Sequence, residues 1–129
     1  MLATRPSDAY SPTIGFAFST QRFHLASGEA VTLQLWDTCG QEPYRNLVSL
    51  YYRDAHAALC VFDYSNPQSL TGLAYWLGQL TDRVDAADLA VRIVGNKADL
   101  KDRPGSLGGA AVQAALEGMG AGGHALVET

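Results

Sequence analysis

The sequence has 129 residues, of which 47% are apolar and 17% are charged. This composition fits one compact domain with a hydrophobic core, and it excludes a collagen-like chain, a coiled coil and a disulfide scaffold. The acidic side chains outnumber the basic ones by thirteen to nine, for a net charge of −4. Because no basic cluster is present, nucleic acid is not an expected partner.

No stretch of the sequence contains the roughly 20 apolar residues of a membrane-spanning helix. The first ten residues lack the apolar core of a secretory signal, and residues 124–129 contain no cysteine for prenylation. Cys39 and Cys60 lack the spacing of a zinc site, and Cys60 lies in an apolar run, so we expect a reduced, intracellular protein. We also expect that this chain carries no lipid anchor of its own. Any contact with a membrane is expected to be indirect.

The first predicted element is a β-hairpin over residues 22–26 and 31–37, with a turn at Ser27-Gly28-Glu29. Apolar and polar residues alternate in the second strand, which indicates a hairpin with one buried face. The apolar residues of that alternation are Val31, Leu33 and Leu35.

A helix is predicted over 44–55, after an irregular start around Gly40 and Pro43. The continuous apolar runs 57–63 and 89–95 are typical of parallel strands covered on both faces. Strands that alternate with helices predict an α/β domain with a mostly parallel sheet.

A second helix is expected to start with Asn66 as N-cap and Pro67 at the first helical position. Its core stripe comprises Leu70, Leu73, Ala74, Leu77, Leu80 and Val84. A third helix over 110–116 and a closing strand over 125–128 complete the chain, although the segment 105–123 is rich in glycine.

Ligand sites in such sheets gather in the loops after the carboxyl ends of the strands. The first of these loops reads Asp37-Thr38-Cys39-Gly40-Gln41-Glu42. Asp37 suits magnesium held through water, Gly40 permits close approach of a phosphate to its N–H, and Gln41 suits the orientation of a water molecule. An ordinary polar turn is an equally open interpretation.

The second loop, Asn96-Lys97-Ala98-Asp99, follows the strand that ends at Gly95. The Asp99 carboxylate suits the ring N–H and exocyclic amine of guanine, a pair of donors that adenine does not present. Asn96 is expected to brace the loop and the Lys97 stem to lie over the base. A solvated polar loop is the alternative.

Together these strings resemble the small GTPases, and the Rab branch in particular. The resemblance also includes Thr13-Ile14-Gly15-Phe16-Ala17-Phe18, Leu33-Gln34-Leu35-Trp36, Tyr51-Tyr52-Arg53-Asp54-Ala55 and Val61-Phe62-Asp63. It covers roughly residues 8–129, where Val127-Glu128-Thr129 resembles the start of the last guanine-contacting motif. The resemblance implies one partial small-GTPase domain over 1–129, with a Ras-like sheet flanked by helices.

The resemblance also implies roles for individual residues. GTP or GDP and Mg²⁺ are the expected ligands, with effector and regulatory proteins as partners at the cytosolic face of endomembranes. Gln41 would be catalytic, and nucleotide would be bound by Gly40, Asn96, Lys97 and Asp99. Thr13 and Asp37 would serve the metal. The effector surface would be Phe18, Trp36 and Tyr51, although core packing is an open alternative for Trp36.

The P-loop motif Gly-x₄-Gly-Lys-Ser/Thr does not occur in these 129 residues. We therefore expect a truncated form that lacks its central first strand and its last helix. Without the backbone donors and lysine of that loop, nucleotide affinity is expected to fall by several powers of ten. Two functions follow: a truncated Rab-type GTPase, or a nucleotide-free module that binds partners through its switch and aromatic surface.

Overall fold

The computed structural model describes residues 16–38, 52, 54–84 and 89–129. The chain divides into two compact units, Met1–Tyr51 and Tyr52–Thr129. We call them the hairpin unit and the sheet unit. The predicted helix over 44–55 lies almost wholly outside the described residues.

The hairpin unit contains two antiparallel strands, β1 (Phe16–His24) and β2 (Ala30–Thr38). Gly28 closes the turn between them with φ of 87°, a left-handed conformation that glycine adopts without steric cost. Its N–H donates to the carbonyl of Leu25 at 2.9 Å. The predicted hairpin is therefore confirmed, with strands longer than the alternation indicated.

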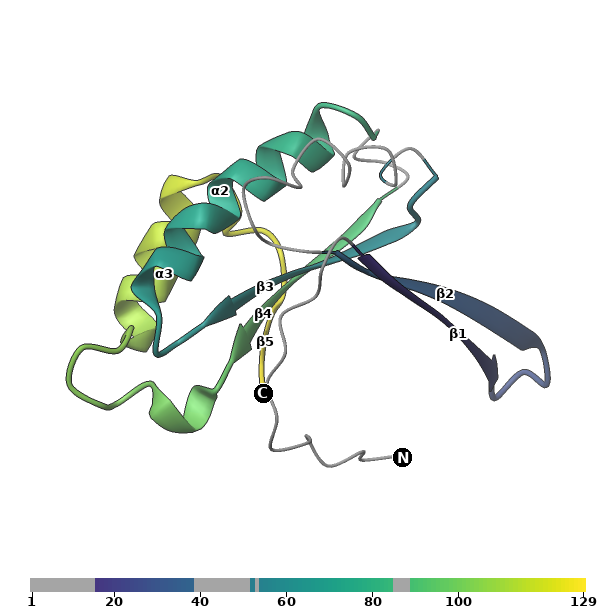
Figure 1. Ribbon diagram of the computed structural model, residues 1–129, viewed down its shortest axis with the longest axis horizontal. Helices are drawn as coiled ribbons and strands as arrows, with labels where there is room; N and C mark the ends of the chain where they lie inside the picture. The colour runs from purple at the N-terminus through teal and green to yellow at the C-terminus, as the bar shows by residue number, and fades with distance from the viewer. Residues whose placement is uncertain (1–15, 39–51, 53, 85–88) are drawn as a thin grey trace. The chain divides into compact units, whose positions relative to one another are not determined.

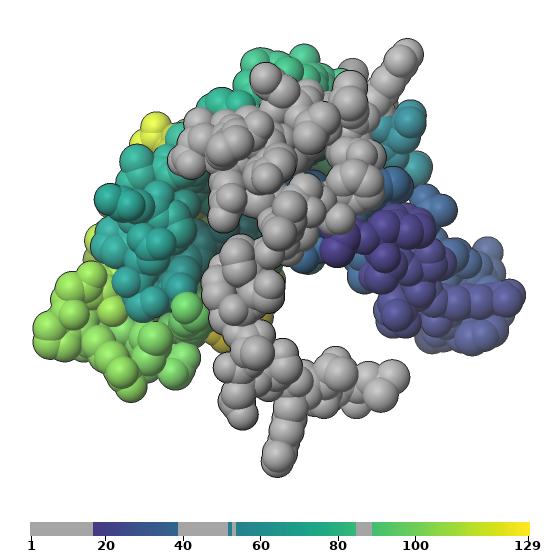
Figure 2. All heavy atoms as spheres, viewed as in Figure 1, coloured from purple at the N-terminus to yellow at the C-terminus, as the bar shows by residue number. Residues whose placement is uncertain are grey.

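The prediction of one buried hairpin face is wrong. The inward set of the alternation, Val31, Leu33 and Leu35, is between 37% and 46% exposed. A two-stranded ribbon has no second layer of its own, so the alternation of β2 defines an apolar face without burying it. In the space-filling view, hairpin side chains are seen at the surface (Figure 2, purple to dark blue).

The sheet unit contains a three-stranded sheet in the order β3 (Ala57–Asp63), β4 (Ala90–Asn96), β5 (Leu126–Glu128). Both strand pairs are parallel. The chain crosses from β3 to β4 through helix α2 (Pro67–Thr81) and from β4 to β5 through helix α3 (Gly109–Gly118) (Figure 1). The predicted fold class, a parallel α/β sheet flanked by helices, is confirmed.

Helix α2 begins as the sequence predicts. The Asn66 side chain accepts a hydrogen bond from the Gln68 N–H at 3.2 Å, and Pro67 occupies the first helical turn. Of the predicted stripe, the four leucines are buried while Ala74 is exposed. None of the helices in the described segments is long and apolar enough to cross a bilayer.

The core of the sheet unit lies between one face of the sheet and the two helices. Residues of β3 and β4 that pair in register, such as Cys60 with Ile93, point to this face. The buried set comprises Cys60, Phe62, Tyr64, Leu70, Leu73, Leu77, Leu80, Leu89, Val91, Ile93, Val112, Leu116 and Ala121. This core fixes the positions of β3 and β4, and the loops at their carboxyl ends follow directly from these strands.

The opposite face of β3 is exposed, with Leu59 67% and Val61 54% accessible. The expectation that this strand is covered on both faces is therefore wrong within the described structure. A continuous apolar run predicts a strand with apolar side chains on both faces. In this structure both helices pack on one face of the sheet, and the other face is left exposed. Among the described residues, β3 pairs with β4 alone.

Candidate functional site

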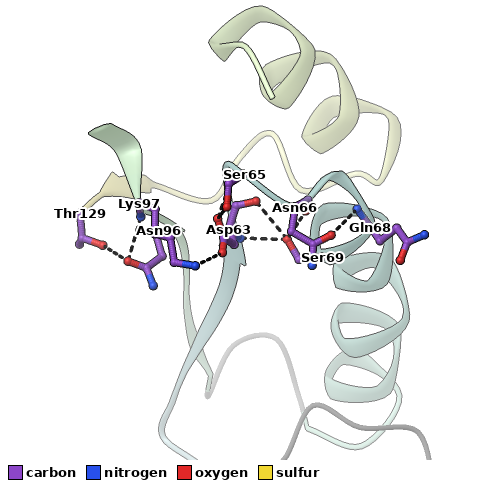
Figure 3. Close-up of polar contacts among 8 residues, drawn as sticks. All are labelled: Asp63, Ser65, Asn66, Gln68, Ser69, Asn96, Lys97 and Thr129. Atoms are coloured by element: carbon purple, nitrogen blue, oxygen red, sulfur yellow. Dashed lines mark hydrogen bonds and ion pairs between the residues drawn. The ribbon is translucent and has the colours of Figure 1, made fainter. Parts of the chain in front are cut away.

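The site is built at the carboxyl ends of β3 and β4. These strands are parallel, and their last residues, Asp63 and Asn96, pair directly in register. Because both strands end at the same edge of the sheet, the loops that follow lie side by side. Figure 3 shows the polar side chains that meet there.

Asn96 braces the loop that follows β4. Its side-chain oxygen accepts hydrogen bonds from the Lys97 N–H at 2.9 Å and from the Thr129 hydroxyl at 3.3 Å. Lys97 takes the left-handed conformation, with φ of 58° and ψ of 44°, and so turns the chain sharply into a short 3₁₀ helix, Ala98–Leu100. Asp99 lies in that turn and is exposed.

Backbone hydrogen bonds hold the same loop from both sides. The Tyr64 N–H donates to the Asn96 carbonyl at 3.0 Å, from the β3 side. On the β5 side, the Thr129 N–H donates to the Gly95 carbonyl at 3.0 Å, and the Ala98 N–H donates to the Thr129 carbonyl at 2.9 Å. The loop is thus preorganised by the protein itself.

Gly95 is required by a close approach of aromatic rings. A Cβ at this position would lie 2.6 Å from Cε2 of Tyr64 and 2.9 Å from Cζ of Phe62. Gly95 pairs with Phe62 on β3 and with Glu128 on β5. The bare backbone of Gly95 therefore leaves the space in which the Tyr64 ring crosses β4.

The Tyr64 ring ends at β5, where its hydroxyl donates to Glu128 Oε1 at 2.6 Å. Burial and this hydrogen bond raise the pKa of Tyr64 to about 12. The other oxygen of Glu128 accepts from Lys101 Nζ at 3.0 Å. Hydrogen bonds from Tyr64 and Lys101 lower the pKa of Glu128, so it stays a carboxylate that anchors the end of β5 beside Thr129.

Asp63 closes the site on the β3 side. Its Oδ1 accepts from the N–H and the hydroxyl of Ser65 at 2.8 and 2.6 Å, and its Oδ2 accepts from Lys97 Nζ at 2.6 Å. Burial by itself raises the pKa of Asp63, but the hydrogen bonds and charge of Lys97 and Ser65 outweigh it, and the pKa is lowered. Asp63 is thus a carboxylate that holds the Lys97 side chain.

The structure brings together three of the predicted site residues: Asn96, Lys97 and Asp99 share one loop, which Thr129 joins from β5. In the hairpin unit, Phe18 and Trp36 face each other across β1 and β2, with ring centroids 4.6 Å apart. Both are exposed, at 49% and 43%, so the core-packing interpretation of Trp36 is wrong in this structure.

The remaining predicted residues, which include those of the phosphate and metal site, belong to the hairpin unit. Asp37 lies on β2 and is exposed. Thr13, Gly40, Gln41 and Tyr51 lie outside the described residues. A carboxylate at a strand end is a suitable oxygen ligand for magnesium, often through water. No cluster of three or more metal-ligating side chains occurs in the described segments.

Asp63 and Tyr64 belong to the site but were not predicted from the sequence. The rule that selected Asp37 and Asn96, a polar residue at the end of an apolar strand, applies equally to Asp63. Nothing local marks Tyr64, because its partner Glu128 is 64 residues away in the sequence.

Comparison with known proteins decides the family. A model of the Ras family matches residues 4–118, which is most of the chain and includes the Asn96–Asp99 loop. The chain belongs to the Ras family. Among Ras-family proteins it is similar to GTP-binding protein YPT1 of Saccharomyces cerevisiae, with 40% identity over 94 residues, 73% of this chain and 45% of YPT1.

Two further relatives come from a plant and a parasite. Ras-related protein RABA2a of Arabidopsis thaliana is 42% identical over 89 residues, covering 69% of this chain and 40% of the relative. Ras-related protein Rab-5B of Plasmodium falciparum is 36% identical over 99 residues, covering 77% of this chain and 47% of the relative. The chain therefore spans less than half the length of these relatives.

Proposed function

We propose that this chain is part of a Rab-type small GTPase and carries the guanine-recognition part of its nucleotide site. The observation that carries the proposal is the loop at the end of β4. Asn96 braces it, Thr129 joins it from β5, and Asp99 stands exposed on its turn. Relatives of this chain are named as GTP-binding proteins, which supports the same ligand.

The chemistry of the loop suits guanine. The exposed Asp99 carboxylate has two acceptor oxygens for the two N–H donors on one edge of that base. Such charge-assisted hydrogen bonds each contribute about 1.5 to 3 kcal/mol, enough for a base preference of about tenfold or more. Lys97, two residues before Asp99 in the same loop, carries an aliphatic stem that would suit the face of the base.

GTP hydrolysis and membrane traffic are proposed for the complete protein to which this segment corresponds. Magnesium would be held with the help of Thr13 and Asp37 and would neutralise phosphate charge. Gly40 would contact the terminal phosphate and Gln41 would orient the attacking water. Effector and regulatory proteins would be its partners at cytosolic faces of endomembranes. Since the Ras-family match spans both units, we further propose that 1–129 forms one partial domain.

Nucleotide competition tests the proposal. A fluorescent guanine nucleotide is bound to the chain in the presence of Mg²⁺ and displaced with unlabelled GDP or ADP. GDP is expected to compete at least about tenfold better than ADP, and Asp99→Asn should remove that preference. Asp102→Asn, which changes an exposed carboxylate just after the 3₁₀ turn, is the matched control. Equal competition by GDP and ADP, or no binding at all, contradicts the proposal.

A second function, a nucleotide-free module that binds proteins, is favoured by the aromatic pair of the hairpin unit. Phe18 and Trp36 are about half exposed and lie 4.6 Å apart, and paired exposed aromatics are typical of protein-binding surfaces. Absence of nucleotide binding, together with a loss of partner binding in Trp36→Ala, would select this alternative.

A further inference from the structure

The structure assigns to Asp63 a role as the positioning residue that holds Lys97 ready for a guanine base. This inference rests on the proposed function and adds a residue to the same site. The direct contact is the 2.6 Å hydrogen bond and ion pair between Lys97 Nζ and Asp63 Oδ2. Figure 3 shows the lysine side chain reaching from its loop toward the end of β3.

The geometry of Asp63 is fixed before it meets the lysine. Ser65 donates both its N–H and its hydroxyl to Oδ1, so that one oxygen is occupied and the other is directed toward Lys97. The Asp63 N–H lies 2.9 Å from the hydroxyl oxygen of Ser69, at the start of α2. The carboxylate is therefore anchored to the crossover between β3 and α2 rather than free to rotate.

The lysine is held at both ends. Its backbone is turned into the left-handed region, and its N–H is bound by the Asn96 side chain at 2.9 Å. Its ammonium group is bound by Asp63. Because a free lysine side chain has many rotamers, fixing both ends restricts the four methylene groups to few orientations. A base that binds there need not order the lysine itself.

The ion pair between Lys97 and Asp63 contributes little to the stability of the fold. The side chains of Lys97 and Asp63 are 51% and 24% exposed, and ion pairs at such exposure contribute little to folding. A positioning role therefore predicts a separation of effects. Asp63→Asn should leave the urea unfolding midpoint nearly unchanged while it frees the lysine and weakens nucleotide binding.

Lysine reactivity measures the contact without any nucleotide. The chain has only two lysines, Lys97 and Lys101, so acylation by acetic anhydride followed by mass spectrometry reports each one separately. In Asp63→Asn, the acylation rate of Lys97 should rise by about twofold to fivefold, the range for loss of an exposed ion pair. Lys101, which is paired with Glu128, should be unchanged. Ser65→Ala should give a smaller rise at Lys97.

GDP competition then connects the contact to the site. Asp63→Asn should lower GDP affinity by about twofold to fivefold, because binding must then order the lysine that the ion pair had held. Glu117→Gln, which removes an exposed carboxylate on α3, is the matched control and should change neither readout. Unchanged acylation of Lys97 in Asp63→Asn overturns the inference, and so does a faster acylation with unchanged GDP affinity. If the unsubstituted chain binds no GDP, both the proposed function and this inference fail. If the unsubstituted chain binds GDP and Asp63→Asn binds it equally well, only the positioning role of Asp63 fails.

Discussion

Replacement of Gly95 by alanine tests the packing that places the loop. The added methyl group would stand 2.6 Å from Cε2 of Tyr64 and 2.9 Å from Cζ of Phe62. Non-bonded carbon atoms do not approach so closely, so at least one ring must move. Both rings are fully buried, at 0% and 1% exposure, and neither has solvent to move into.

The expected cost follows from overpacking a buried site. Inserting a methyl group into a close-packed core lowers the free energy of unfolding by about 1 to 3 kcal/mol. Displacement of the Tyr64 ring also disturbs its 2.6 Å hydrogen bond to Glu128, which places this change toward the upper end of the range. The Thr129 N–H, which donates to the Gly95 carbonyl, should lose protection from hydrogen exchange.

Urea unfolding of the two variants Gly95→Ala and Gly72→Ala provides the assay and its control. Gly72 lies inside α2, and a methyl group added there would meet no neighbouring side chain within 4 Å, so alanine should raise the free energy of unfolding by about 0.5 to 1 kcal/mol. Both substitutions replace glycine by alanine, but they should change the free energy of unfolding in opposite directions. A neutral or stabilising effect of Gly95→Ala would refute the packing argument.

Three further predictions concern the sheet unit. Leu73→Ala should lower the free energy of unfolding by about 2 to 5 kcal/mol in urea titrations, whereas Leu59→Ala, at an exposed position, should change it by less than about 1 kcal/mol; equal effects would contradict the assignment of faces. Asn66→Ala should lower the free energy of unfolding by about 1 kcal/mol in the same titration, because the α2 cap is lost. Asn66→Asp should keep most of the capping stabilisation, because aspartate is also a good N-cap residue. Because burial raises the pKa of Tyr64 from 10.0 to about 12, the folded state favours the protonated phenol. This stabilisation is complete below pH 10 and is lost as pH rises toward 12, so thermal melts of Tyr64→Phe should show a shallower alkaline decline.

The elements of the sheet unit could be predicted because their signals are local. The apolar run 57–63 matches the observed bounds of β3, and Asn66 with Pro67 marks the start of α2. The Asn96–Asp99 loop could likewise be placed, since a polar string after a buried strand lies at the sheet edge. Each of these inferences needs only neighbours in the sequence.

The burial of each face could not be predicted, because it depends on the layer that packs against it. The alternation in β2 and the apolar run of β3 both indicate surfaces that avoid water, yet Leu35 and Leu59 are exposed. Long-range pairs were missed for a related reason. The contact between Asp63 and Lys97 joins residues 34 apart, and only the parallel register of β3 and β4 brings them together.

The central claim, that the loop after β4 recognises guanine, is tested most directly by mapping GDP on the ¹⁵N-labelled chain. Addition of GDP should shift the amide resonances of Asn96, Lys97, Asp99 and Thr129, and equal, sub-saturating concentrations of ADP should shift them far less. Equal shifts with the two nucleotides, or shifts that fall elsewhere in the sheet unit while these four amides stay fixed, would contradict the account.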